Sequence, residues 1–129
     1  MTESIFQFTN PALSKMEFLI NEGFDNNITE VQMKMNISMN VSKSEDENKA
    51  LVSLVCEIGE KSNEVPFWIS AEENADFKWN DEISKDLEEK LLHQNAPSLL
   101  LSYLRPIVSQ LTAATRYGAY NIPFVNFTK

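Results

Sequence analysis

The chain is poor in the residues from which most catalytic and metal sites are built. Its 129 residues include one Cys and one His, and no glycine-rich phosphate-binding loop. Cys56 lies in an apolar alternating row, which favours a small core residue. His93 has no partners at metal-ligand or catalytic-triad spacing. The sequence therefore predicts no catalytic residue, no metal ligand and no cofactor, and we expect a protein that is not an enzyme.

Positive charge and long apolar runs are also scarce. Eleven Lys and Arg against nineteen Asp and Glu give a formal net charge of −8, whereas nucleic-acid binding requires clustered basic residues. No run approaches about 18 apolar residues, and the N-terminus lacks the basic start and apolar stretch of a signal peptide. A single Cys forms no internal disulfide. We therefore expect a cytoplasmic protein with no nucleic-acid partner and no membrane insertion.

Few residues favour disorder, since only three Gly and five Pro occur. We expect one domain over residues 1–129. Its clearest pattern is at 30–43, where six apolar residues alternate with polar ones and predict a strand with one buried face. Similar rows predict strands at about 13–21, 49–60 and 64–79. Glu73 interrupts the last row, which suggests a bulge at about 72–75.

From residue 81 the apolar spacing becomes helical. It predicts a helix at about 81–94 and, with Asn95 as N-cap, a second helix at about 96–117 that Gly118 ends. The segment at 119–127 is too apolar to remain in water, so it must lie against its own domain or another molecule. These elements predict an α+β fold, a four-stranded antiparallel sheet followed by two helices.

The binding features of this sequence are apolar rather than charged. Four of the five methionines fall on predicted strands, and Met serves both as a gap filler in cores and as an adaptable element of promiscuous binding surfaces. Core or interface packing is the commoner of these roles. Trp68 alternates onto the face opposite Phe67 and Ile69, which makes it a candidate anchor for binding or assembly.

The C-terminal third, QNAPSLLLSYLRPIVSQLTAATRYGAYNIPFVNF, resembles the end of the SecB protein-export chaperone family. Its closing motif is one residue shorter than the family's common form. The stretch LVCEI at 54–58 is similar to the family's third strand. The residues that carry the C-terminal resemblance are Ala96, Pro97, Tyr103, Arg105, Ser109, Thr112, Gly118, Asn121, Ile122, Pro123, Val125, Asn126 and Phe127.

This resemblance implies a Greek-key sheet with its first and second strands at opposite edges. A crossover at about 22–29 would join them, and two helices would cover one face. It also implies a homo-oligomer, a dimer of dimers, that holds unfolded polypeptides without ATP in apolar grooves. The client-groove candidates are Phe24, Ile28, Met33, Met35, Trp68, Leu100, Leu104 and Phe124.

The resemblance leaves three functions open. The first is a general holdase for non-native polypeptides, with export through the SecA motor as one use, for which Val55 and Glu57 are docking candidates. The resemblance implies that SecA docking also uses acidic residues of the first strand, where only Glu17 is acidic, and an extended C-terminal tail, which we do not expect here. The second is a dedicated SecB-like chaperone of a toxin-antitoxin system, with an antitoxin as its partner. The third is an oligomeric adaptor protein with the same fold and no chaperone activity.

Overall fold

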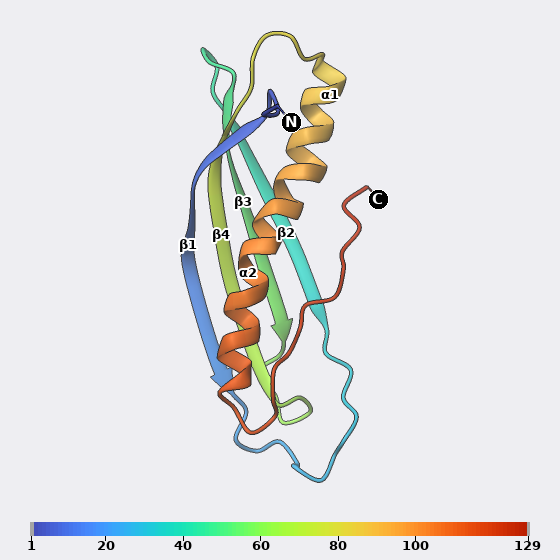
Figure 1. Ribbon diagram of the computed structural model, residues 1–129. Helices are drawn as coiled ribbons and strands as arrows, with labels where there is room; N and C mark the ends of the chain where they lie inside the picture. Colours follow the sequence, from blue (N-terminus) through green and yellow to red (C-terminus); the bar gives the residue numbers. More distant parts are fainter. Residues whose placement is uncertain (1, 129) are drawn as a thin grey trace.

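The computed structural model describes residues 2–128 as a four-stranded sheet covered on one face by a long helix (Figure 1). The spatial order is β1-β4-β3-β2, with every neighbouring pair antiparallel. The α+β class, the antiparallel sheet and the placing of the first and second strands at opposite edges are confirmed. The strands are β1 (Gln7–Ile20), β2 (Met35–Lys43), β3 (Lys49–Gly59) and β4 (Phe67–Lys78).

The two outer strands differ from their predicted bounds. β2 begins at Met35 because residues 31–34 belong to the connection that precedes it. β1 begins at Gln7, well before residue 13, and Phe8 pairs with Phe77 of β4. Asn10, whose φ is +53°, and the following Pro11 break the alternation there. Because of these two residues, the sequence periodicity did not reveal the first half of the strand.

The predicted irregularity in the sheet lies in β1 rather than in β4. The β1–β4 register shifts between Thr9 and Ala12 and again between Leu13 and Lys15, whereas β4 pairs with β3 without a shift. An edge strand accommodates extra residues more easily than a central strand, which is paired on both sides. Glu73 therefore keeps its place in the apolar row and is buried, with only 2% of its surface exposed.

The two predicted helices are one continuous helix of 29 residues. It comprises α1 (Lys85–Lys90), a single π-helical turn η1 (Leu91–Asn95) and α2 (Ala96–Ala113). The N-cap is Ser84, whose Oγ accepts a 3.1 Å hydrogen bond from the Leu87 N–H. Asn95 has a helical backbone and caps nothing. The predicted break there was wrong, because the π-helical turn carries the helix past Pro97, which lacks a backbone N–H.

The core lies between this helix and the sheet. Burial is complete or nearly complete along the inner rows of β3 and β4 and along the facing side of α2, whose Leu100, Leu104 and Val108 have no exposed surface. The helix ends at Ala113 rather than at 117, and Gly118, with φ +80°, lies in the turn that follows. Among residues 2–128, no helix has the length and apolar character needed to cross a bilayer.

Candidate functional site

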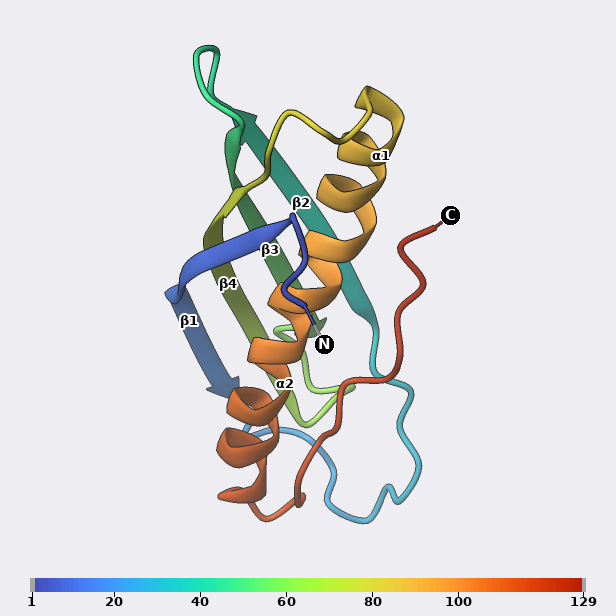
Figure 2. The same ribbon diagram turned by 45° about the horizontal axis from the view of Figure 1, so that its top comes forward.

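One end of the sheet is closed by the chain between β1 and β2, here called the crossover segment (residues 21–34) (Figures 1 and 2). Asn21 attaches its start: the buried side-chain Nδ2 donates to Glu60 O at 2.7 Å and to Val65 O at 3.0 Å. At the other end, the Gly59 N–H donates to Lys34 O at 2.8 Å. Both ends of the crossover segment are therefore held by the connection between β3 and β4.

Gly59 brings the crossover segment close to the sheet. Its φ is +74°, and a Cβ added there would lie 2.1 Å from the carbonyl oxygen of Phe67 and 2.9 Å from Cε of Met33. Only glycine fits this conformation and this close approach. The Met33 side chain thereby packs at the end of the sheet instead of standing away from it.

The chain that follows the helix meets the crossover segment at the same end. The Tyr117 ring packs edge-on against Phe24, with ring centroids 5.8 Å apart, and its hydroxyl donates to Asn26 Oδ1 at 3.1 Å. The Tyr120 ring packs edge-on against Phe67, at 6.0 Å between centroids. Aromatic pairs in this geometry stabilise a contact beyond the area they bury. Two segments distant in sequence thus form one surface.

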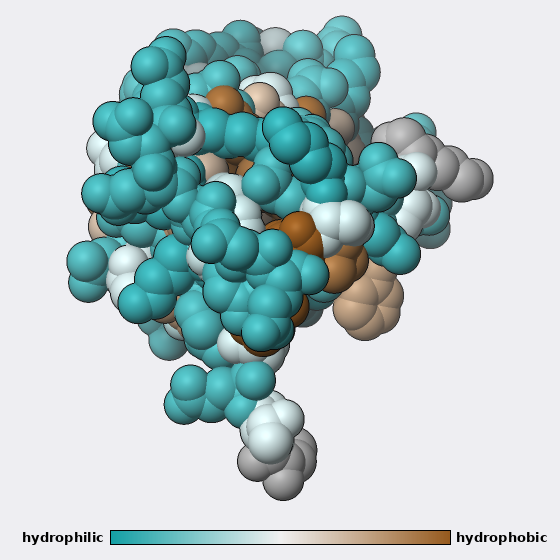
Figure 3. Space-filling model, turned by 90° about the horizontal axis from the view of Figure 1, so that it is seen from above, coloured by the Kyte–Doolittle hydropathy of each residue, from teal (hydrophilic) through white to brown (hydrophobic). Residues whose placement is uncertain are grey.

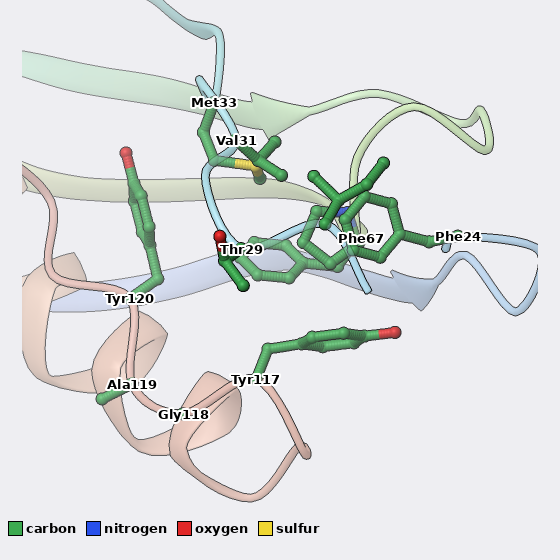
Figure 4. A pocket seen from close by; sticks show the side chains of 11 residues that line it. Phe24, Thr29, Val31, Met33, Phe67, Tyr117, Gly118, Ala119 and Tyr120 are labelled. Carbon is green, nitrogen blue, oxygen red and sulfur yellow. The ribbon is translucent and has the colours of Figure 1, made fainter. Parts of the chain in front are cut away.

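A cavity of about 230 Å³ lies between these two segments (Figure 4). In Figure 4, side chains from the crossover segment, β4 and the chain after α2 surround it. None of the described residues that line the cavity is charged, which suits a large apolar group rather than an ion or a phosphate. The lining residues are Phe24, Ile28, Thr29, Val31, Met33, Pro66, Phe67, Tyr117, Gly118, Ala119 and Tyr120.

The structure brings three of the eight predicted groove residues to this cavity, namely Phe24, Ile28 and Met33. Phe24 is buried, whereas Ile28 is 47% exposed and accessible from solvent. Met35 is half-buried beside the core on the helix-facing side of β2. The side chains accessible at the cavity come from irregular chain, which adapts more readily than a packed strand or helix.

The remaining groove candidates lie elsewhere. Leu100 and Leu104 have no exposed surface and belong to the core under α2. Phe124 is 95% exposed, on the chain that follows the helix. Trp68 lies on the sheet face turned away from the helix, with Lys61 Nζ 4.3 Å from its ring centroid. The structure therefore does not join these four residues to the cavity.

The docking candidates Val55 and Glu57 share that outer face with Trp68. The register pairs Glu57 with Ser70 and Gly59 with Trp68, so these side chains lie on one side of the sheet. Val55 is half-buried and Glu57 is exposed. A partner bound at the outer face and a ligand in the cavity would thus contact different surfaces.

The cavity also contains aromatic residues that sequence reasoning missed, chiefly Tyr117 and Tyr120. Tyr117 was assigned to the helix, which ends four residues earlier. The available signal was the pair of tyrosines that flank Gly118 and Ala119 in the segment RYGAY. Burial, and secondarily the nearby Cys56, raise the pKa of Tyr120, so its hydroxyl stays neutral at physiological pH.

Among the described residues, those that line the cavity include no carboxylate, imidazole, thiol or amino side chain. Burial is the main reason that the pKa of Cys56 rises to about 11, with Glu57 adding to the shift, and a neutral thiol is a poor nucleophile. Within residues 2–128, no cluster of three or more His, Cys, Asp or Glu side chains is arranged to hold a metal ion. The geometry supports binding of apolar groups.

Comparison with known proteins gives a family and a fold. The family model described as "Preprotein translocase subunit SecB" matches residues 16–129. A SecB-like chaperone of Mycobacterium tuberculosis, solved in complex with a peptide from an antitoxin, is similar with a TM-score of 0.74 and 12% identity. That match covers 93% of this chain and 90% of the chaperone.

A second solved structure, a protein of unknown function from Streptococcus agalactiae, matches less well. Its TM-score is 0.51 at 12% identity, over 92% of this chain and 97% of that one. No curated protein matches the sequence. At these identities the two structures support the fold alone, while the family model assigns the family.

Proposed function

The chain belongs to the SecB family, and we propose on this basis that it is an ATP-independent holdase that binds unfolded polypeptides at the cavity between the crossover segment and the chain after α2. SecB family members are chaperones. The finer assignment, to a holdase that retains non-native chains, is the proposal. Retaining unfolded chains shifts their folding and aggregation equilibria by binding alone, so no catalytic group is required.

The observation that carries this proposal is the uncharged lining of the cavity. Apolar and aromatic side chains there are supplied by two irregular segments, and Met33 adds a flexible, polarisable group. A site that accepts many sequences needs adaptable apolar contacts rather than fixed polar ones. The cavity combines these properties and leaves Ile28 exposed at its margin.

The experiment is a dilution assay with the full-length protein. A chemically denatured client is diluted into buffer with an equimolar amount of the assembled protein, and light scattering follows its aggregation. The proposal predicts that scattering is suppressed without nucleotide. Unchanged aggregation of several unrelated clients would contradict a general holdase.

A second candidate function is a dedicated chaperone for one antitoxin. The similar M. tuberculosis chaperone, which binds an antitoxin peptide, favours it. Proteins co-purified from the native cell and identified by mass spectrometry separate the two. Many unfolded proteins indicate a general holdase, and one antitoxin indicates the dedicated form. One folded partner would instead indicate an adaptor.

The proposal also covers assembly and location. It places the protein in the cytoplasm as a homo-oligomer, a dimer of dimers, and it assigns any SecA-like partner to the outer sheet face at Val55 and Glu57. Sedimentation measures the assembly state. A Glu57→Lys variant tests the docking surface, because reversing an exposed charge weakens an acidic docking site. Val55→Ser is the apolar counterpart, and client binding should persist in both variants.

A further inference from the structure

We propose that the C-terminal segment (residues 119–128) is the resting occupant of a peptide channel beside the cavity, and that an extended segment of a client displaces it. This inference rests on the proposed function and specifies its ligand. In Figures 1 and 2 the segment leaves the end of α2 and returns alongside α2 and β2 as an elongated chain. Its first residues, Ala119 and Tyr120, line the cavity, and it has no regular secondary structure.

Four side chains of the segment pack against the domain. Ile122 is inserted into the core and is 5% exposed, while Tyr120, Val125 and Phe127 are half-buried against the core cluster. An unfolded client with large apolar residues at the same relative positions, at i, i+2, i+5 and i+7, presents the same chemistry. The channel therefore selects an extended chain with that spacing of bulky side chains.

Few hydrogen bonds hold the segment. The Tyr120 N–H donates to Thr112 Oγ1 at 2.7 Å, and Arg105 Nη2 donates to Pro123 O at 2.8 Å. Among residues 2–128, no backbone–backbone hydrogen bond joins the segment to a strand. A true sheet strand would have a ladder of such bonds to break, whereas this segment is held by side-chain insertion and two polar contacts.

Arg105 also holds the segment, although one of its own hydrogen-bond donors is left unpaired. Its guanidinium lies over the ring of Phe124, 5.1 Å from the centroid, yet its Nε is buried and has no hydrogen-bond partner among residues 2–128. A buried donor left unpaired is unfavourable. Any client that offers a carbonyl oxygen and an apolar ring replaces these contacts one for one, so exchange of the segment for a client costs little in polar interactions.

An occupied channel lowers the apparent client affinity by the fraction of molecules in which it is open. Loosening the segment in the full-length chain should therefore strengthen client binding. In Ile122→Ser, we expect the affinity for a permanently unfolded client to rise at least threefold. Asn121→Ser, an exposed neighbour in the same segment, is the matched control and should bind as the wild type does.

Two further measurements keep the test independent of any loss of stability in Ile122→Ser. Hydrogen exchange on the wild-type protein with saturating client should show faster exchange of the Tyr120 amide, which loses its bond to Thr112 Oγ1, and slower exchange in the crossover segment. A synthetic peptide of residues 119–128 should compete with the client, and a scrambled peptide of the same composition should compete less.

The outcomes separate this inference from the proposed function. Slower or unchanged exchange of the Tyr120 amide in the client complex would overturn the inference while leaving the holdase intact, and so would unchanged affinity in Ile122→Ser together with equal competition by the two peptides. If neither the wild type nor Ile122→Ser binds any client, the proposed function and this inference fail together.

Discussion

The two ends of the sheet are closed by different contacts: ion pairs at one, here called the charged end, and an uncharged cavity lining at the other, here called the apolar end. At the end where α1 lies, the surface is largely hydrophilic (Figure 3), and Lys43 Nζ bonds both to Glu88 Oε2, at 3.0 Å, and to Glu89. Hydrogen bonds to Glu89 and then Glu88 raise the pKa of Lys43, and Lys43 lowers the pKa of Glu89. At the other end, uncharged residues of the crossover segment and the chain after α2 surround a cavity.

The difference separates stability from binding. Between the two ends, the inner rows of β3 and β4 and the covering face of α2 are almost fully buried, and such packing supplies most of the stability of a small domain. The apolar end is built from irregular chain with half-buried side chains, which opens at lower free-energy cost than the core. Substitutions in the core should thus affect the whole molecule, and those at either end should act locally.

Leu104→Ala should have the largest effect, because it truncates a side chain of the core that supports both ends of the sheet. Leu104 has no exposed surface, and such a truncation leaves a cavity, so the free energy of unfolding should fall by about 2–5 kcal/mol. Urea unfolding followed by far-UV circular dichroism measures it. Leu51→Ala, at an exposed residue of β3, is the control and should change stability far less. Equal losses in both variants would contradict a single core under the helix.

Glu73 gives the next effect, because it is buried in an apolar row with Oε1 unpaired. Burial raises its pKa above the ordinary 4.5, so the folded state retains a proton that the unfolded state releases. Stability from this group is full below pH 4.5 and is lost as pH rises through the raised pKa. At pH 8, Glu73→Leu should raise the free energy of unfolding by about 1–3 kcal/mol.

The measurement is urea unfolding of wild type and Glu73→Leu at pH 5 and pH 8. The free energy of unfolding of the wild type should decline from pH 5 to pH 8, and that of the variant should decline less. Glu72→Leu is the control: Glu72 lies on the outer face, where Ser14 Oγ donates to its Oε2 at 2.7 Å, and no stabilisation is expected. If the free energy of unfolding of the wild type rises from pH 5 to pH 8, and that of Glu73→Leu rises by the same amount, then Glu73 is not a buried carboxyl with a raised pKa.

At the apolar end, Ile28→Ser should act on binding alone. Because Ile28 is 47% exposed, its replacement should change the free energy of unfolding by less than about 0.5 kcal/mol. The loss of an apolar contact with clients should lower affinity about tenfold, or about 1.4 kcal/mol. Fluorescence anisotropy with a labelled unfolded client measures the affinity. Leu19→Ser, at a similarly exposed residue on the outer face, should retain it.

The smallest effect should come from the charged end. Lys43→Met removes the contacts with Glu88 and Glu89, but exposed ion pairs contribute little and are screened by salt. We expect a slightly lower thermal midpoint in low salt, no difference in 1 M NaCl and unchanged client binding. If client affinity falls more in this variant than in Ile28→Ser, then clients bind at the charged end and not at the cavity.

Sequence periodicity predicted the bounds of an element well where one of its faces is buried and the other is not. It predicted β3 within one residue of its observed bounds, because every second residue from Ala50 to Ile58 is apolar and polar residues flank the row. It failed where tertiary pairing overrides the local pattern. Glu73 looked like a bulge in β4, but the central strand stays regular and β1 bulges instead. Asn95 looked like a cap, but a π-helical turn continues the helix.

The candidate site was only partly predictable for the same reason. Phe24 and Ile28 were found through the crossover that the family resemblance implies, and Met33 through the alternating apolar row of the predicted strand at 30–43. Tyr117 and Tyr120 were missed because their contacts with Phe24 and Phe67 join residues far apart in sequence. Leu100 and Leu104 fit a helical apolar stripe, and such a stripe does not show which residues are covered by the sheet and which face a ligand.

The most direct test of the account is site-specific photo-crosslinking to an unfolded client. A photoreactive phenylalanine analogue is placed in turn at Ile28, beside the cavity, and at Leu19 and Leu51, on the outer sheet face. The account predicts client adducts from position 28 and few from positions 19 and 51. Adducts concentrated at positions 19 and 51, with none at 28, would place client binding on the outer face and contradict the account.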